Sequence, residues 1–563
     1  MVSMLLACSE PGQPAPYGAI DGVPAADATT SPASAAADLG PTAADEQVQF
    51  TVSLNLRDEQ GLADFLEGVS DAGSPDFRQF LSAAEFGERF GLGSAAIGRV
   101  VAWLESTGLS AEAMPQRTSI AVSGAAEGVN RLLGVTLVDW LTATGARYHQ
   151  PAGEPLVPAD LRDEVAAVLG LDTEPVLRPA FGGPILADGV PVGGLRPNTV
   201  ARAYEIEPLH ATGFDGAGQT VAIISFDTFT PSDVELFDQR EGIDAPPVEI
   251  VRLRNAAEEP GPGTGEVALD IQVIRGIAPQ AQIINYEGPN TANGFAALVA
   301  RIVADGRAEI VSISWGLCEK YSLDSALRAE EREFAAAFAA GLSVFVASGD
   351  DGAFGCRRVA ISQDPFERDL SRDVMWPSTS VSTIGVGGTF LSIREDGTYL
   401  DEAGWEEPLS GGGGGGGLST VARRPSWQQG LGVDNSDSNG MRQVPDVAGP
   451  SDPSSGFFVV YTEPGQGLVN GQIGGTSAAA PFWAASMILT RQMAAAEGLD
   501  SLGALGPTLY GIAAEQTSGA VFHDVIRGGN LLHEAGPGWD YSTGLGTPRV
   551  APLARAIIDF LSR

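Results

Sequence analysis

The stretch that decides how this sequence is interpreted is Gly474-Gly475-Thr476-Ser477-Ala478-Ala479-Ala480-Pro481, which leads into a helical pattern over 482–493. Two glycines followed by Thr-Ser predict a tight turn at the start of a helix, where the serine hydroxyl lies beside unpaired backbone N–H groups. Such N–H groups can stabilise an oxyanion. A bare Gly-Thr-Ser would indicate only a helix N-cap, but the longer string favours Ser477 as a nucleophile.

A serine nucleophile needs a base, and the histidines of this chain do not provide an obvious one. The string around Ser477 resembles the nucleophile segment of subtilisin-like peptidases, whose base is a histidine followed by Gly-Thr. None of the four histidines here has that context, and we interpret them as surface or capping residues: His149, His210, His523 and His533. Asp227 resembles the subtilisin aspartate position, but without a histidine it has nothing to orient.

Two carboxylates four residues apart supply the alternative base. Glu266 and Asp270 fall on one face of a helix, and the same face continues through Val273 and Ile274. Paired acids usually mark a solvated face, but apolar neighbours predict that these point into the core. Like charges there would repel unless a proton is shared, which favours an acidic medium.

A third acidic residue, Asp350, lies in Ala347-Ser348-Gly349-Asp350-Asp351-Gly352, just after an apolar run over 344–346. The carboxyl end of a buried strand is a suitable place for a catalytic group. An aspartate that closes an ordinary glycine turn is the alternative.

The fold class follows from alternating strand and helix patterns. Apolar β-rich runs occur at 221–225, 282–286, 309–314 and 342–347, with helical patterns at 266–276, 292–304 and 323–340. This alternation predicts an α/β domain with a parallel sheet and helices on both faces. Seven consecutive glycines at 411–417 receive no role.

The N-terminal third has a different organisation. Residues 1–45 resemble a linker, 46–178 an α+β unit, and 179–197 a Gly/Pro-rich connector where processing is expected. Within the α+β unit we expect a strand at 48–54, short strands near 118–123 and 135–140, and helices at 58–68, 94–108 and 158–168. The remaining residues, 198–563, carry the α/β pattern.

Composition excludes several functions. Lys+Arg number 33 and Asp+Glu 71, for a formal charge of −38, so nucleic acid is not an expected partner. Nothing approaches an apolar run long enough to span a membrane. Leu5-Leu6-Ala7-Cys8 resembles the lipobox of bacterial lipoproteins, although an accidental cysteine after a short apolar stretch is an equal alternative.

Together with Ser312-Ile313-Ser314-Trp315-Gly316 and Arg424-Pro425-Ser426-Trp427-Gln428, these segments resemble the sedolisins, or serine-carboxyl peptidases, a family that includes kumamolisin. The resemblance implies a subtilisin-like fold over 198–563 and an activation prodomain over 46–178. It also implies roles for four residues: Ser477 as nucleophile, Glu266 as general base, Asp270 as the group that orients Glu266, and Asp350 as the oxyanion-hole acid.

The resemblance further implies one structural Ca²⁺ ion near the C-terminus. Its ligands would be the side chains of Asp524 and Asp540 and the carbonyls of Val525, Gly536 and Gly538. A tight turn is the alternative reading of these residues. Cys318 and Cys356 both lie near the expected active centre, where either a disulfide or two separate buried thiols would be consistent with the sequence.

The expected function is that of an acid-acting endopeptidase, exported as a zymogen and cut from its inhibitory prodomain in the connector. We expect a secreted monomer, with Cys8 as a lipid anchor if the lipobox is genuine. Three alternatives remain: a catalytically silent protein that binds peptides, a tripeptidyl exopeptidase of the same family, and a neutral peptidase that uses one of the histidines.

Overall fold

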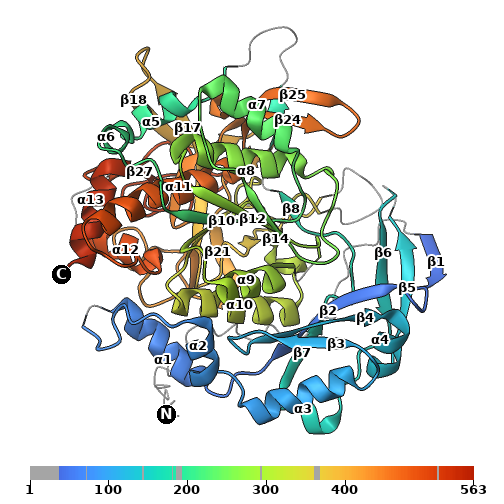
Figure 1. Cartoon of the computed structure of the whole chain (residues 1–563). Helices are drawn as coiled ribbons and strands as arrows, with labels where there is room; N and C mark the ends of the chain where they lie inside the picture. Colours follow the sequence, from blue (N-terminus) through green and yellow to red (C-terminus); the bar gives the residue numbers. More distant parts are fainter. Residues whose placement is uncertain are drawn as a thin grey trace, which may run out of the picture.

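The computed structural model (Figure 1) describes residues 37–71, 73–142, 145–179, 182–185, 193–291, 294–359, 368–515 and 519–563. Cys8, most of the linker 1–45 and part of the connector 179–197 lie outside these residues. None of the helices in the described ranges has the length and apolar character that a bilayer crossing demands.

The centre of the chain is an eight-stranded sheet, as the alternating pattern predicted. Its order is β11 (Glu249–Arg252), β12 (Gln282–Glu287), β10 (Thr220–Ser225), β13 (Ile310–Ile313), β15 (Ser343–Ala347), β17 (Ile384–Ile393) and β18 (Tyr399–Gly404), with β23 (Val447–Pro450) also paired to β17. All of these pairs are parallel except β17 with β18.

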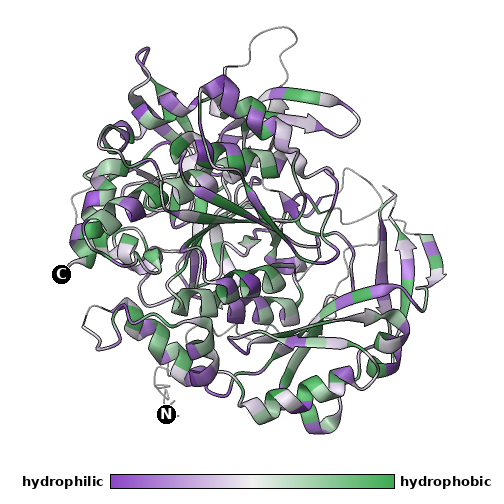
Figure 2. Ribbon diagram, in the orientation of Figure 1, coloured by the Kyte–Doolittle hydropathy of each residue, from purple (hydrophilic) through white to green (hydrophobic). Residues whose placement is uncertain are grey.

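Helices cover both faces of this sheet, which confirms the expected fold class (Figure 1). One face packs against α8 (Thr264–Ile277), α11 (Thr476–Ala496) and α13 (Val550–Leu561), and the other against α9 (Gly294–Asp305) and α10 (Asp324–Ala339). Alternate residues of each strand enter different cores, as Ile223 and Ile224 do in β10. Figure 2 shows the resulting hydrophobic centre of the sheet. The fold therefore follows from strands that are apolar on both faces.

The N-terminal unit is built on an antiparallel sheet in the order β3 (Ser110–Ala113), β4 (Ser119–Ala125), β2 (Gln47–Leu54) and β7 (Val165–Leu169). The helices α3 (Ser94–Glu105) and α4 (Ala126–Leu133) pack on it. A second small sheet contains β1 (Ala37–Pro41), β5 (Thr136–Leu141) and β6 (Arg147–Ala152).

The helix expected over 158–168 is wrong. A short 3-10 turn covers Ala159–Leu161, and Val165–Leu169 forms β7, which pairs with β2. The segment Val165-Ala166-Ala167-Val168-Leu169 fits either a short helix or a strand on local pattern alone. Pairing with a neighbouring strand decides between them, because β-branched valines suit a pleated surface.

The N-terminal unit contacts the catalytic sheet through α10. The helices α1 (Glu59–Ser70) and α2 (Ala83–Arg89) share a core with α9 and α10. Glu333 of α10 is buried and accepts hydrogen bonds from Ser119 Oγ at 2.8 Å and Gln116 Nε2 at 3.2 Å. The interface is therefore partly apolar and partly built on a buried carboxyl group.

The connector runs back onto the catalytic unit as two short strands. β8 (Arg178–Pro179) pairs antiparallel with β14 (Trp315–Cys318), and β9 (Gly182–Ile185) pairs antiparallel with β25 (Gly467–Gly474). β14 begins one residue after Ser314, and β25 ends three residues before Ser477. The connector strands thus lie on the two segments that flank the nucleophile.

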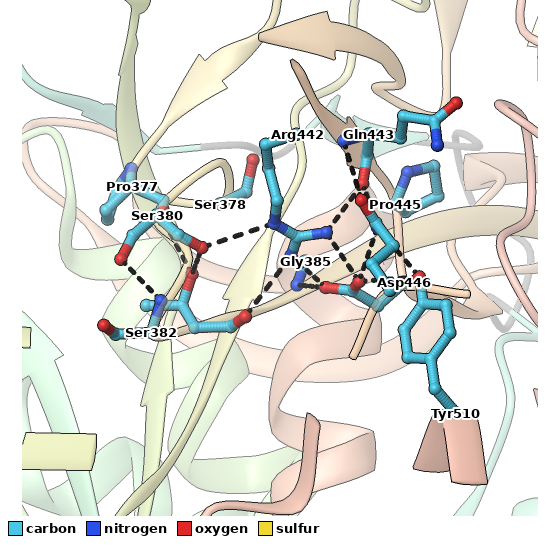
Figure 3. Close-up of polar contacts among 12 residues, drawn as sticks. Pro377, Ser378, Ser380, Ser382, Gly385, Arg442, Gln443, Pro445, Asp446 and Tyr510 are labelled. Carbon is cyan, nitrogen blue, oxygen red and sulfur yellow. Dashed lines mark hydrogen bonds and ion pairs between the residues drawn. The ribbon is translucent and has the colours of Figure 1, made fainter. Parts of the chain in front are cut away.

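A buried ion pair joins Arg442 to Asp446, the residue directly before β23 (Figure 3). Arg442 donates to Asp446 Oδ1 at 2.8 Å and to its Oδ2 at 2.5 Å, and both side chains are almost fully buried. Asp446 also accepts from the backbone N–H of Gly385 at 2.7 Å and from the hydroxyl of Tyr510 at 2.9 Å. These contacts fix β23 against β17.

Candidate active site

Ser477 is the second residue of α11, as the glycine-flanked string predicted. Gly475 is the N-cap with φ of 118°, a backbone conformation that favours glycine. The preceding strand β25 ends at Gly474, so the chain turns sharply from strand to helix at this point. The Ser477 side chain is 0 % exposed.

Glu266 lies in the first turn of α8, and it contacts the nucleophile directly. Ser477 Oγ donates to Glu266 Oε2 at 3.0 Å. Because α8 packs beside α11, a residue 211 positions away is brought to the hydroxyl. Glu266 and Asp270 are both 0 % exposed, so the pair does not form a solvated face.

Asp270 is joined to Ser477 through Ser314, a residue to which the sequence had assigned no role. Ser314 Oγ donates to Asp270 Oδ1 at 2.6 Å, and its backbone carbonyl lies 3.4 Å from Ser477 Oγ. Ser314 follows the carboxyl end of β13, the position where a parallel sheet is expected to present functional groups. The Ser-Trp-Gly string at 314–316 was the available signal.

Burial controls the protonation of the carboxyl pair. Burial raises the pKa of Glu266 well above its usual value, and the nearby Asp270 charge raises it further. Burial also raises the pKa of Asp270 well above its usual value. Glu266 Oε1 and Asp270 Oδ2 have no hydrogen-bond partner among the described residues. A proton held by this pair would relieve both the repulsion and the unpaired oxygens.

Asp350 lies on the other side of the α11 N-terminus. Its Oδ1 accepts from the backbone N–H of Thr476 at 2.8 Å and from the Thr476 hydroxyl at 3.0 Å. Its Oδ2 is buried and has no hydrogen-bond partner in the described part of the chain. Burial raises the pKa of Asp350 to about 7, while the nearby Arg358 guanidinium opposes that rise. The carboxyl is therefore protonated in acidic medium.

The glycine run 411–417, which the sequence left without a role, supports the loop that carries Asp350. Gly415 N–H donates to the Gly349 carbonyl, and Ser348 Oγ donates to the Gly415 carbonyl, each at 2.7 Å. A Cβ on Gly415 would lie 2.0 Å from the Ser348 carbonyl oxygen. The backbones approach so closely that a side chain at Gly415 would displace the Asp350 loop.

Cys318 and Cys356 form a disulfide, with their Cα atoms 5.2 Å apart, which decides between the two alternatives left by the sequence. Cys318 ends β14, and Cys356 follows the Asp350 loop. The bond therefore ties the strand that receives the connector to the loop that carries Asp350.

The four histidines lie in other contacts. His210 Nε2 contacts the Ile277 carbonyl at 2.8 Å, His523 stacks on Tyr399, and His533 packs against Tyr541. His149 lies in β6 of the N-terminal unit. The hydrogen bonds of the Ser477 hydroxyl go instead to Glu266 and to the Ser314 carbonyl.

Asp227 has a structural contact that the sequence did not indicate. Its carboxylate accepts backbone N–H groups from Thr228 at 2.8 Å, Gly261 at 2.9 Å and Gly263 at 2.7 Å. Gly263 is the N-cap of α8. Asp227 thus orients the backbone that leads to Glu266 rather than a histidine.

Of the expected calcium ligands, the carboxylates of Asp524 and Asp540 both contact the backbone of the loop 536–540. The N–H of Gly538 donates to Asp524 Oδ1 at 3.1 Å, and the N–H of Gly536 donates to Asp540 Oδ2 at 3.0 Å. Burial raises the pKa of Asp540 to about 6. Two half-buried carboxylates against a glycine-rich loop supply oxygen donors of the kind that a hard cation prefers, so the chemistry of these side chains is compatible with the expected ion.

Among the described residues, two other groups of side chains contain residue types that can bind a metal ion. In one, Cys318 and Cys356 are consumed by the disulfide. In the other, Glu46 and Asp139 beside His149 are already paired with Arg147.

Comparison with known proteins gives the same assignment along nearly the whole chain. The family "Pro-kumamolisin, activation domain" matches residues 34–174, and the "Subtilase family" matches residues 255–502. Kumamolisin from Bacillus sp. strain MN-32 is 34% identical over 554 residues, covering 94% of this chain and 95% of its own. Sedolisin from Pseudomonas sp. strain 101 is 30% identical over 551 residues, covering 93% and 89%.

More distant relatives and a solved structure extend the comparison. Tripeptidyl-peptidase 1 from Canis lupus familiaris is 24% identical over 577 residues, covering 92% of this chain and 93% of its own. The structure of Pseudomonas sedolisin, a serine-carboxyl proteinase complexed with two molecules of pseudo-iodotyrostatin, matches with a TM-score of 0.55 at 29% identity, covering 66% of this chain and 99% of that one. This chain therefore belongs to the sedolisin family of serine-carboxyl peptidases and carries that family's activation domain at its N-terminus.

Proposed function

We propose that the chain is an acid-acting endopeptidase, made as a zymogen, in which Ser477 is the nucleophile and Glu266 its base. The observation that carries this proposal is the hydrogen bond of 3.0 Å from the Ser477 hydroxyl to Glu266 Oε2. Burial raises the pKa values of Glu266 and Asp270, so in acidic medium the pair keeps one shared proton while the ionised carboxylate accepts the proton of Ser477.

In the proposed reaction Ser477 Oγ attacks the carbonyl carbon of the peptide bond, and its proton passes to Glu266. Glu266 then returns that proton to the leaving amine, which breaks the C–N bond and leaves an acyl-enzyme. A water molecule repeats the sequence and releases the new carboxyl group. Asp270 holds Glu266 by sharing a proton with it, and Ser314 orients Asp270 through its 2.6 Å hydrogen bond.

Asp350 is the proposed oxyanion stabiliser. Its Oδ1 accepts hydrogen bonds from Thr476, whereas its Oδ2 has no hydrogen-bond partner in the described part of the chain, so a proton on Oδ2 can be donated to the oxyanion. Only the protonated acid can donate, which restricts this role to pH values below its raised pKa. Removing one such donor typically costs about 3–4 kcal/mol of transition-state stabilisation.

The course of the connector supports an endopeptidase over a tripeptidyl exopeptidase. Asn290 holds the backbone of Leu177 at both its N–H, at 2.8 Å, and its carbonyl, at 2.9 Å, and β8 continues along β14 towards Ser314. The chain upstream of Leu177 continues into the N-terminal unit. A strand pairing that holds a segment with chain on its N-terminal side suits internal peptide bonds, and we propose peptides and proteins as substrates.

The same course supports self-processing within 179–197. β8 ends at Pro179 and β9 begins at Gly182, with Ser477 between their partner strands. We place the first cut within the connector 179–197. Until that cut the N-terminal unit inhibits the enzyme, because its connector covers the strand that substrates would pair with.

The remaining parts of the proposal concern the ion and the setting. A Ca²⁺ ion bound by Asp524, Asp540 and the carbonyls of Val525, Gly536 and Gly538 would neutralise the buried carboxylates and fix the C-terminal loop. We propose that the protein acts as a monomer outside the cell, where a disulfide persists. Anchoring through Cys8 is part of this proposal only if Cys8 is lipidated.

The test is to incubate the full chain and its Ser477→Ala variant at about pH 4 and to measure fragment masses with time. We expect the wild type to lose its N-terminal unit by a cut within the connector 179–197, and the variant to stay intact. Equal processing of both proteins would refute self-cleavage. Product masses from a long unlabelled peptide then separate internal cuts from successive release of tripeptides, and a silent protein would release neither.

A further inference from the structure

An arginine lies against the proposed oxyanion acid without blocking it. Arg358 Nη2 is 3.8 Å from Asp350 Oδ2, and Arg358 Nε is 3.0 Å from Asp351 Oδ2. The Arg358 side chain is 38% exposed, whereas the Asp350 side chain is 1% exposed. Arg358 lies two residues after Cys356, so the disulfide to Cys318 fixes the segment that carries it.

We propose that Arg358 is a positioning residue that sets the upper pH limit of peptide hydrolysis, by holding a positive charge against the carboxyl group that donates to the oxyanion. This inference rests on the proposed role of Asp350.

The distances explain why Arg358 acts through charge rather than as a direct donor. A separation of 3.8 Å is too long for a hydrogen bond, so Asp350 Oδ2 keeps its own proton available for the substrate. It is short enough for a strong Coulomb interaction beside a buried carboxyl group. The Arg358 guanidinium is held in place by its hydrogen-bond-length contact with Asp351, not by Asp350.

Burial and a neighbouring acid raise the pKa of Asp350, whereas Arg358 lowers it. Burial raises the pKa of Asp350 to about 7, the Arg358 charge lowers it, and the Asp351 charge raises it. Asp350 and Glu266 also repel, which contributes to the raised pKa of Glu266. Arg358 is thus the cation that keeps the pKa of Asp350 from rising further, and its removal should extend the protonated state towards alkaline pH.

Arg358 also contacts the connector strand β8. Its backbone carbonyl accepts a hydrogen bond of 2.9 Å from Arg178 Nη1, in β8. Asp351 interacts electrostatically with both arginines. The charge of Arg358 therefore sits where a bound peptide strand meets the oxyanion loop, and not on a remote surface.

The experiment measures kcat/KM of the self-processed enzyme against pH for wild type and for Arg358→Gln. An opposite charge at this range shifts a carboxyl pKa by roughly 1–3 units, and partial exposure favours the lower end. We expect the alkaline limb of Arg358→Gln to lie about one pH unit higher, which is about tenfold more residual activity beyond the wild-type limb. A structural defect would instead lower activity at every pH without moving the limb.

Two matched variants separate charge from other effects. Arg358→Lys keeps the charge, and its limb should stay close to that of the wild type. Arg357→Gln removes the neighbouring guanidinium, which donates to the Ser410 carbonyl at 2.8 Å, and its limb should not move. The proposal is overturned if the Arg358→Gln limb stays in place, or if Arg358→Lys moves as far as Arg358→Gln.

Asp350→Asn distinguishes failure of this inference from failure of the proposed function. If Asp350→Asn keeps the wild-type limb, Asp350 is not the titrating acid and the proposed function is wrong on that point. If Asp350→Asn loses the limb while Arg358→Gln leaves it unmoved, only the role of Arg358 is wrong. Affinity for a peptide aldehyde, which forms a tetrahedral adduct with the serine, is measured over the same pH range. This measurement gives the pH dependence of oxyanion binding even for a variant that does not hydrolyse peptides.

Discussion

Replacing Glu330 with glutamine should make the folded state less sensitive to alkaline pH. Glu330 lies on α10 and is 1% exposed. Its Oε2 accepts from the Trp376 indole at 2.6 Å, and its Oε1 has no hydrogen-bond partner among the described residues. Burial raises the pKa of Glu330 to about 8. The protonated acid is therefore the form that fits its surroundings.

The sign and size follow from proton linkage. Because the pKa is higher in the folded than in the unfolded chain, the folded state binds more protons between the two values. The stability that protonated Glu330 contributes is fully present below its unfolded-state pKa of about 4.5. This contribution is lost as pH rises towards the folded-state pKa of about 8, by about 1.4 kcal/mol per pH unit. Between about pH 5 and about pH 8, Glu330 should therefore cost the wild type up to roughly 4 kcal/mol.

The assay is urea unfolding of the full chain at about pH 5 and at about pH 8. Every protein also carries Ser477→Ala, which prevents self-digestion. Glu330→Gln should match its parent within about 1 kcal/mol near pH 5, because the carboxamide oxygen still accepts from Trp376. Near pH 8 the variant should be the more stable of the two. Glu235→Gln, at an exposed position, is the control and should follow the parent at both values.

A constant difference between parent and Glu330→Gln at the two pH values would refute this reasoning. So would a variant that loses stability relative to its parent as pH rises. Either result would mean that Glu330 is ionised, or solvated, in the folded chain.

Three further perturbations test other contacts. Ser314→Ala removes the 2.6 Å donor to Asp270 and leaves a buried acceptor unpaired, which costs roughly 1–3 kcal/mol, so we expect kcat to fall by about 10- to 100-fold and the unfolding free energy to fall within that range; an unchanged kcat would contradict the role of Ser314. A calcium chelator should lower the melting temperature of the full chain, and Asp540→Ala should remove that dependence; a chelator effect of equal size in both proteins would exclude this site. Arg442→Met breaks the buried pair with Asp446 and should cost about 3–5 kcal/mol in urea unfolding, whereas a loss below about 1 kcal/mol would show that the pair is dispensable.

Patterns with a strong period gave reliable predictions. The apolar run at 221–225 and the helical pattern at 266–276 became β10 and α8, because burial on both faces of a parallel sheet requires continuous apolar strands. The pairing of Glu266 with Ser477 was also accessible, since the i,i+4 spacing placed both acids on one helix face and no histidine had a suitable context.

Features that depend on distant backbone were not accessible. The segment 165–169 became β7 only because β2 was available to pair with it. The need for glycine at Gly415 depends on its closeness to the Ser348 carbonyl, which no local pattern encodes. The charge of Arg358 on Asp350 likewise arises from a loop that a disulfide folds back onto the site.

The two connector strands have a kinetic consequence. β8, β9 and Ser477 belong to one polypeptide, so the first bond offered to the hydroxyl is supplied at an effective concentration set by the fold and not by the solution. Dilution should leave the half-time of the first cut unchanged, whereas cleavage of any other protein slows with dilution. A concentrated stock and a trace amount of this zymogen would then mature at the same rate once the medium turns acidic.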